Sequence, residues 1–157
     1  MTAVPDSPRL EVDVVKAVRA PVPPSFVRSL LARTASLPEV AARLPEGTSR
    51  IAVRITGDRE LRRLNKTYAG NDSVTDVLSF AGSGDHLGDL AISWETVLSQ
   101  AADFNDAPVS ELALLCVHGM LHLLGWDHAA GSERKEMVRL TIAALELSDV
   151  RLPAGRI

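Results

Sequence analysis

One apolar stretch constrains this chain more than any other, because it also carries three of the four histidines. It covers residues 112–128 and reads LALLCVHGMLHLLGWDH. His118 and His122 are four residues apart, so a helix places both on one face, about one turn from each other. Gly125 is suited to ending that helix and turning the chain, which lets His128 approach the same point. The stretch therefore predicts three imidazoles around one divalent metal ion.

The spacing H-x3-H-x5-H, with a glycine three residues after the second histidine, matches the zinc-binding segment of metzincin proteases. Three imidazoles leave one coordination position open, as in catalytic zinc sites, although they also suit nickel, copper or cobalt. The proteases carry a glutamate general base directly after the first histidine, whereas this chain has Gly119. Either the metal acidifies the attacking water, or a carboxylate elsewhere accepts the proton. Asp127 and Asp89 are candidates, and Asp127 equally fits a hydrogen bond that orients an imidazole.

The rest of the chain predicts a single domain. With 157 residues, 46% hydrophobic and 24% charged, residues 1–157 suffice for one core, with 1–8 and 151–157 expected to be loose. The single Cys116 excludes an internal disulfide and fits a reducing compartment. No secretory signal is visible, and the longest apolar run is shorter than a membrane span. A cytoplasmic protein without a membrane or disulfide partner is expected.

Hydrophobic patterning predicts an α+β fold. Alternating apolar residues indicate strands at 10–18 and 50–55, and further short strands at 76–80 and 88–93 could form a hairpin. Helices are expected from the caps Ser25, Asp58, Ser93 and Ser132, and from Pro108 for the central helix. About four strands and four to five helices give a small mixed sheet, with the metal site on the central helix. The first two strands, separated by a helix, are expected to be parallel.

Charge is unevenly distributed, although the net charge is only −3. Residues 67–131 contain no lysine or arginine and nine acidic residues, so a polyanion cannot be held by this segment alone. The second predicted strand and the helix after it carry a basic set that could hold RNA backbone, although a solvated face explains it equally well. That set is Arg50, Arg54, Arg59, Arg62, Arg63 and Lys66.

Residues 118–128, HGMLHLLGWDH, resemble the signature of the YbeY endoribonuclease family, the bacterial rRNA maturation factors. Two further segments match the family in the same order: residues 64–80, with LN at 64–65 and TDVLSF at 75–80, and GDLAIS at 88–93. The resemblance extends from about residue 61 to residue 137. It departs at Ala69, where the family usually has an arginine that would be a natural phosphate clamp.

The resemblance implies a zinc-dependent, single-strand-specific endoribonuclease that acts in 16S rRNA 3′-end maturation and ribosome quality control in the cytoplasm. It implies His118, His122 and His128 as ligands of one Zn²⁺ ion, and a 16S rRNA precursor, the small ribosomal subunit and its assembly factors as partners. Two alternatives stay open. The chain could be a metal-dependent hydrolase of another substrate, such as a peptide, or a ribosome-assembly binding protein whose metal is mainly structural.

Overall fold

The sheet combines three parallel strands with one antiparallel strand. In a computed structural model that describes residues 9–69, 76–127 and 131–157, the strands are β1 (Arg9–Lys16), β2 (Thr48–Thr56), β3 (Val77–Ala81) and β4 (His86–Ser93). Their order is β1-β2-β4-β3. Strands β1, β2 and β4 are parallel, and β3 forms a hairpin with β4. The α+β class, the mixed sheet, the parallel first pair and the hairpin are all confirmed.

The described residues form six helices beside the sheet, one more than the largest number predicted. They are α1 (Pro24–Ala35), α2 (Pro38–Ala41), α3 (Asp58–Ala69), α4 (Trp94–Asp103), α5 (Pro108–Leu123) and α6 (Gly131–Leu147). The additional helix is α2, which is a single turn. The predicted cap at Ser25 is wrong, because α1 already begins at Pro24, whose fixed φ suits the first helical position.

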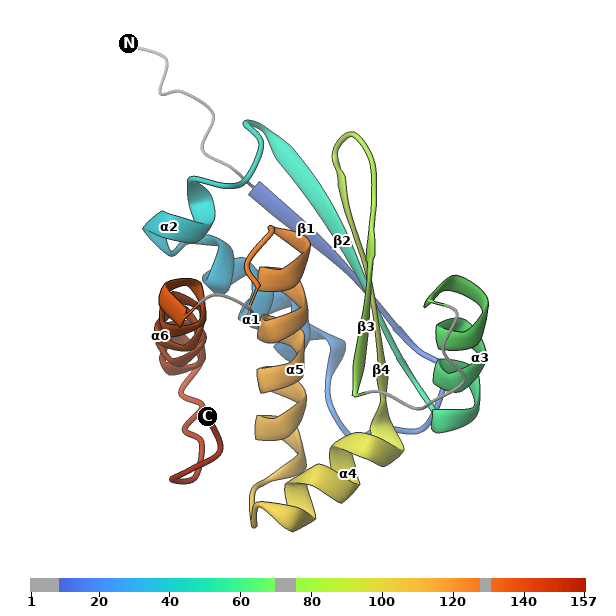
Figure 1. Cartoon of the computed structure of the whole chain (residues 1–157). Coiled ribbons are helices and arrows are strands. Elements are labelled where there is room, and N and C mark those ends of the chain that lie inside the picture. Colours follow the sequence, from blue (N-terminus) through green and yellow to red (C-terminus); the bar gives the residue numbers. More distant parts are fainter. Residues whose placement is uncertain (1–8, 70–75, 128–130) are drawn as a thin grey trace, which may run out of the picture.

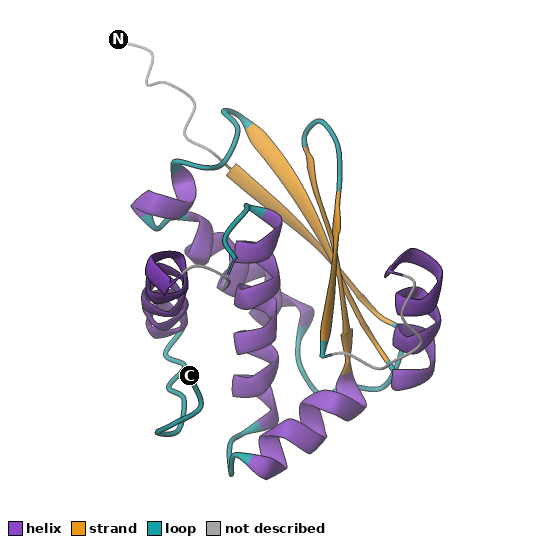
Figure 2. Ribbon diagram, viewed as in Figure 1, coloured by secondary structure: helices purple, strands orange, loops and turns teal. Residues whose placement is uncertain are grey.

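The helices form unequal layers on the two faces of the sheet (Figure 1). Helices α1 and α5 cover one face, and α6 packs against these two helices. Helix α3 lies on the other face of the sheet (Figure 2). Strand alternation explains the arrangement: Ile51, Val53 and Ile55 are buried under the helical layer, while Arg50 and Arg54 point to the opposite face. Helix α5 is therefore enclosed between the sheet and α6.

The junction between β4 and α4 is fixed by side-chain hydrogen bonds. Ser93 Oγ accepts a hydrogen bond from the backbone N–H of Thr96 at 3.2 Å, which confirms the predicted cap of α4. The hydroxyls of Ser93 and Thr96 both donate to Asp58 at the start of α3, the latter at 2.8 Å. The sheet end, α3 and α4 are thus joined at one carboxylate.

Within the described ranges, no helix is long and apolar enough to cross a bilayer. Helix α5 is the most apolar of the helices, and its Cys116 is a free, fully buried thiol. The side chain packs in the core, because its position two residues before His118 directs it away from the face that carries the histidines.

Cys116 is expected to be inert in the folded protein. Burial raises the pKa of its thiol to about 12, and only the thiolate reacts with disulfide reagents. Labelling with such a reagent at about pH 8 should be negligible under native conditions and complete in denaturant. Rapid labelling of the native protein would contradict this packing.

Candidate metal and RNA site

Helix α5 carries the first two predicted ligands and ends where the sequence predicts. Gly125 adopts a positive φ of 97°, which favours glycine. Its backbone N–H donates to the carbonyl of His122 at 3.0 Å, and that of Trp126 donates to Leu121 at 3.0 Å. These bonds satisfy the last carbonyls of the helix and turn the chain immediately after His122.

The two helical histidines face each other. Their Nε2 atoms are 3.1 Å apart, and the ring centroids are separated by 4.7 Å at an interplanar angle of 68°. Both side chains are half-buried, so a small ligand can reach them from solvent. The predicted pairing of His118 and His122 on one helix face is therefore present in the structure.

This geometry fits a shared metal ion. Two imidazole nitrogens bound to one tetrahedral zinc at about 2.0–2.1 Å would be separated by about 3.3 Å. The observed 3.1 Å between the Nε2 atoms is close to this value, and it is also the length of a hydrogen bond between two imidazoles. The separation of the two Nε2 atoms is therefore compatible with two ligands of one divalent ion.

The third predicted ligand, His128, lies outside the described residues. Among the residues that are described, no group of three or more His, Cys, Asp or Glu side chains could hold a metal ion. The described residues therefore contain two of the three predicted ligands, His118 and His122.

Arg43 holds the chain that leads from α5 toward His128. Its guanidinium lies over the Trp126 ring, 3.6 Å from the centroid, and Nη1 donates to the Leu124 carbonyl at 3.1 Å. Trp126 itself is buried and covers the helix end. Sequence reasoning missed Arg43, because no local pattern connects a lone arginine to a turn about 80 residues later.

The two candidate carboxylates occupy different places. Asp89 is exposed, and its Oδ1 lies 3.2 Å from Nε2 of His86. Its neighbours Gly88 and Leu90 face α5, so alternation directs Asp89 to the opposite face of the sheet, away from the histidine pair. Asp127 follows Trp126 at the end of the α5 turn and is exposed. The structure therefore separates Asp89 from α5 and leaves Asp127 on the histidine side.

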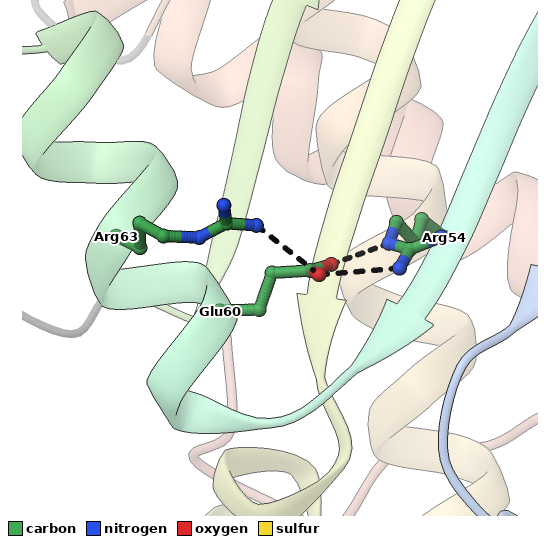
Figure 3. Close-up of polar contacts among 3 residues, drawn as sticks. All are labelled: Arg54, Glu60 and Arg63. Carbon is green, nitrogen blue, oxygen red and sulfur yellow. Dashed lines mark hydrogen bonds and ion pairs between the residues drawn. The ribbon is translucent and has the colours of Figure 1, made fainter.

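The predicted basic residues lie on the face of the sheet opposite α5. Arg54 forms a bidentate pair with Glu60, and Arg63 lies 3.5 Å from the same carboxylate (Figure 3). The hydrogen bond from Arg54 lowers the pKa of Glu60, and the same bond raises that of Arg54. Arg50 is paired with Glu11 at 3.3 Å. These ion pairs partly neutralise three of the six basic residues. The other three, Arg59, Arg62 and Lys66, are exposed on α3.

A buried ion pair lies near the start of α5. Glu111 is fully buried, and Arg156 donates to it through both Nε, at 3.0 Å, and Nη2. The Arg156 guanidinium also lies over the Phe104 ring, 4.4 Å from its centroid. Arg156 belongs to the segment 151–157 that was expected to be loose, and it fixes that segment against α5.

The fold and the site together define a small α+β protein with one mixed sheet and an imidazole pair on its central helix. A family model described as endoribonuclease YbeY matches residues 22–148. The endoribonuclease YbeY of Roseiflexus castenholzii is 43% identical over 133 residues, which cover 78% of this chain and 80% of the relative. That of Chloroflexus aggregans is 44% identical over 123 residues, covering 71% and 80%.

The chain belongs to the YbeY endoribonuclease family, which confirms the resemblance seen in the sequence. A Thermotoga maritima protein with a known solution structure has the same fold, with a TM-score of 0.61 and 21% identity. The alignment covers 93% of this chain and all of the other.

Proposed function

We propose that this chain is a zinc-dependent endoribonuclease specific for single-stranded RNA, in which His118, His122 and His128 hold one ion. The observation that carries the metal proposal is the 3.1 Å separation of the two Nε2 atoms on α5. Family membership supports the coarser statement that the chain is a hydrolase acting on RNA. The finer proposal is a cytoplasmic role in 16S rRNA 3′-end maturation and late ribosome quality control, with the small subunit and its assembly factors as partners.

The chemistry of such a site divides between the ion and the protein. A divalent ion held by three imidazoles supplies Lewis-acid polarisation of a phosphodiester and lowers the pKa of water. Helix α5 fixes the two rings on a rigid element, and Arg43 fixes the turn that follows. We infer that Asp127 is the better proton acceptor of the two candidates, because it follows the turn at the end of α5, whereas Asp89 points to the face of the sheet opposite the histidine pair.

The proposal is tested by measuring bound metal and cleavage in the same preparations. Native protein should contain about one zinc per chain and cleave a single-stranded oligoribonucleotide but not its duplex. His118→Ala and His122→Ala should lose the metal and the cleavage, whereas His86→Ala should keep both. Absence of metal from the native protein would overturn the proposal. Metal without cleavage beyond that of the variants would favour the ribosome-assembly binding protein.

We also propose that RNA backbone contacts the exposed cations of α3. The described part of the chain gives no ion pair for Arg59, Arg62 or Lys66, unlike Arg50, Arg54 and Arg63. Helices α3 and α5 cover opposite faces of the sheet. An RNA strand bound to α3 must therefore pass around the edge of the sheet to reach the histidines.

Ala69→Arg is expected to increase RNA affinity about three- to tenfold, since one charge-assisted phosphate contact at the end of α3 would be added. The slope of log affinity against log salt should steepen by about one. Ala69→Gln adds length without charge and serves as the control. Equal affinities for the arginine and glutamine variants would contradict a phosphate contact at this position.

A further inference from the structure

A cavity adjoins His118 on the side of α5 away from the sheet. It has a volume of about 220 Å³ and lies between α5, α6 and the C-terminal segment 151–157. Its apolar walls come from Leu114, Met137, Val138 and Ile157, and its polar wall includes His118 and Arg134. A larger cavity of about 700 Å³, between α6 and the same segment, contains neither histidine of α5.

Arg134 is the cation of this cavity that remains available to a ligand. The other arginine on its wall, Arg156, is bound to Glu111 through two hydrogen bonds. Arg134 is exposed, and no ion pair is found for it among the described residues. It is also the first basic residue after the acidic segment 67–131. Arg134 is therefore the cation of this cavity that can pair with an anion bound near His118.

The size and lining fit one small group that packs on apolar walls and is linked to a phosphate. The cavity is smaller than a site for a drug-sized molecule, which usually exceeds about 300 Å³. Thr141 adds no free donor, because its hydroxyl donates to the Met137 carbonyl at 2.7 Å. Bases of single-stranded RNA are free to leave the stack and pack on apolar side chains, whereas bases of a duplex are not.

We propose that this cavity receives one unpaired base of the RNA strand, with Arg134 on the adjoining phosphate. The inference rests on the proposed function and adds a subsite to it. Two of the lining residues, Arg156 and Ile157, lie beyond the residues 22–148 matched by the family model. The C-terminal segment thereby completes a wall of the subsite.

Binding of a short fluorescein-labelled oligoribonucleotide to the whole chain in EDTA tests the subsite without cleavage. The probe is compared with an abasic oligomer of equal length and charge. Native protein should prefer the base-bearing strand about tenfold. Val138→Trp fills the cavity and should remove this preference while keeping the affinity for the abasic strand. Ile142→Trp, one turn later on α6 and outside this cavity, should keep the preference for the base-bearing strand. A preference that survives in Val138→Trp would overturn the base subsite.

The phosphate contact is tested by two neighbouring charge deletions. Arg134→Ala should weaken both oligomers about fivefold or more, whereas Lys135→Ala, which removes the same charge outside the cavity, should weaken them less than about twofold. Equal losses would overturn the role of Arg134. Because binding is measured without metal, a native protein that discriminates bases but never cleaves RNA would refute the proposed function and leave the subsite standing. A native protein that cleaves RNA but does not discriminate between the two oligomers would refute the subsite and leave the proposed function standing.

Discussion

Arg156→Ala is expected to lower the free energy of unfolding by about 3–5 kcal/mol, because it leaves the Glu111 carboxylate buried without its partner. Glu111 has 0% exposed side-chain area, and the Arg156 side chain is only 14% exposed. Loss of Arg156 therefore leaves a buried carboxylate without the two hydrogen bonds that it accepts. The hydrogen bond with Glu111 raises the pKa of Arg156, so the guanidinium stays charged throughout the neutral range, and the effect should persist there.

Urea denaturation of a matched set of variants measures the effect. Arg151→Ala, an exposed cation of the same segment, should cost less than about 0.5 kcal/mol. The double variant Glu111→Leu with Arg156→Ala should be more stable than Arg156→Ala alone, since the buried charge is gone. If Arg156→Ala costs no more than Arg151→Ala, the pair does not hold the C-terminal segment.

Local patterns predicted the elements near the histidine pair well. Gly125 and Ser93 work as helix signals because their effects need only a few neighbouring residues: a positive φ in one case and a hydrogen bond to Thr96 in the other. The spacing of His118 and His122 works for the same reason, since helix geometry alone brings the two rings together.

Contacts between distant residues were not predictable in the same way. Glu111 and Arg156 are separated by 45 residues, and Arg43 and Leu124 by 81. No periodicity records such a pairing, so a segment that contains Arg156 reads as a polar terminus. The side of the sheet on which Asp89 lies depends on the register of β4, which is shifted between Arg50 and Ile51 of β2. A one-residue shift reverses the face, and the sequence does not specify it.

Gly119 explains why this site differs from that of the proteases with the same histidine spacing. An added Cβ would lie 2.8 Å from Leu90 Cδ2, 3.1 Å from Leu90 Cδ1 and 3.2 Å from Val77 Cγ2. Leu90 is buried between β4 and α5, so its side chain has little room to move. The residue after the first histidine thus faces the sheet, and glycine lets the helix approach the strands closely.

Gly119→Glu is therefore expected to unfold or strongly destabilise the protein rather than supply a general base. Overpacking costs about 1–3 kcal/mol, and a carboxylate forced against Leu90 and Val77 adds the penalty of an unpaired buried charge. Gly119→Ala should be much milder, because the gain of about 1 kcal/mol in helix propensity offsets part of the overpacking. Urea denaturation separates the two variants, and cleavage of a peptide and of single-stranded RNA tests for new chemistry. A stable Gly119→Glu protein with raised hydrolysis of either substrate would show that position 119 reaches the reacting groups, in contradiction to its packing against the sheet.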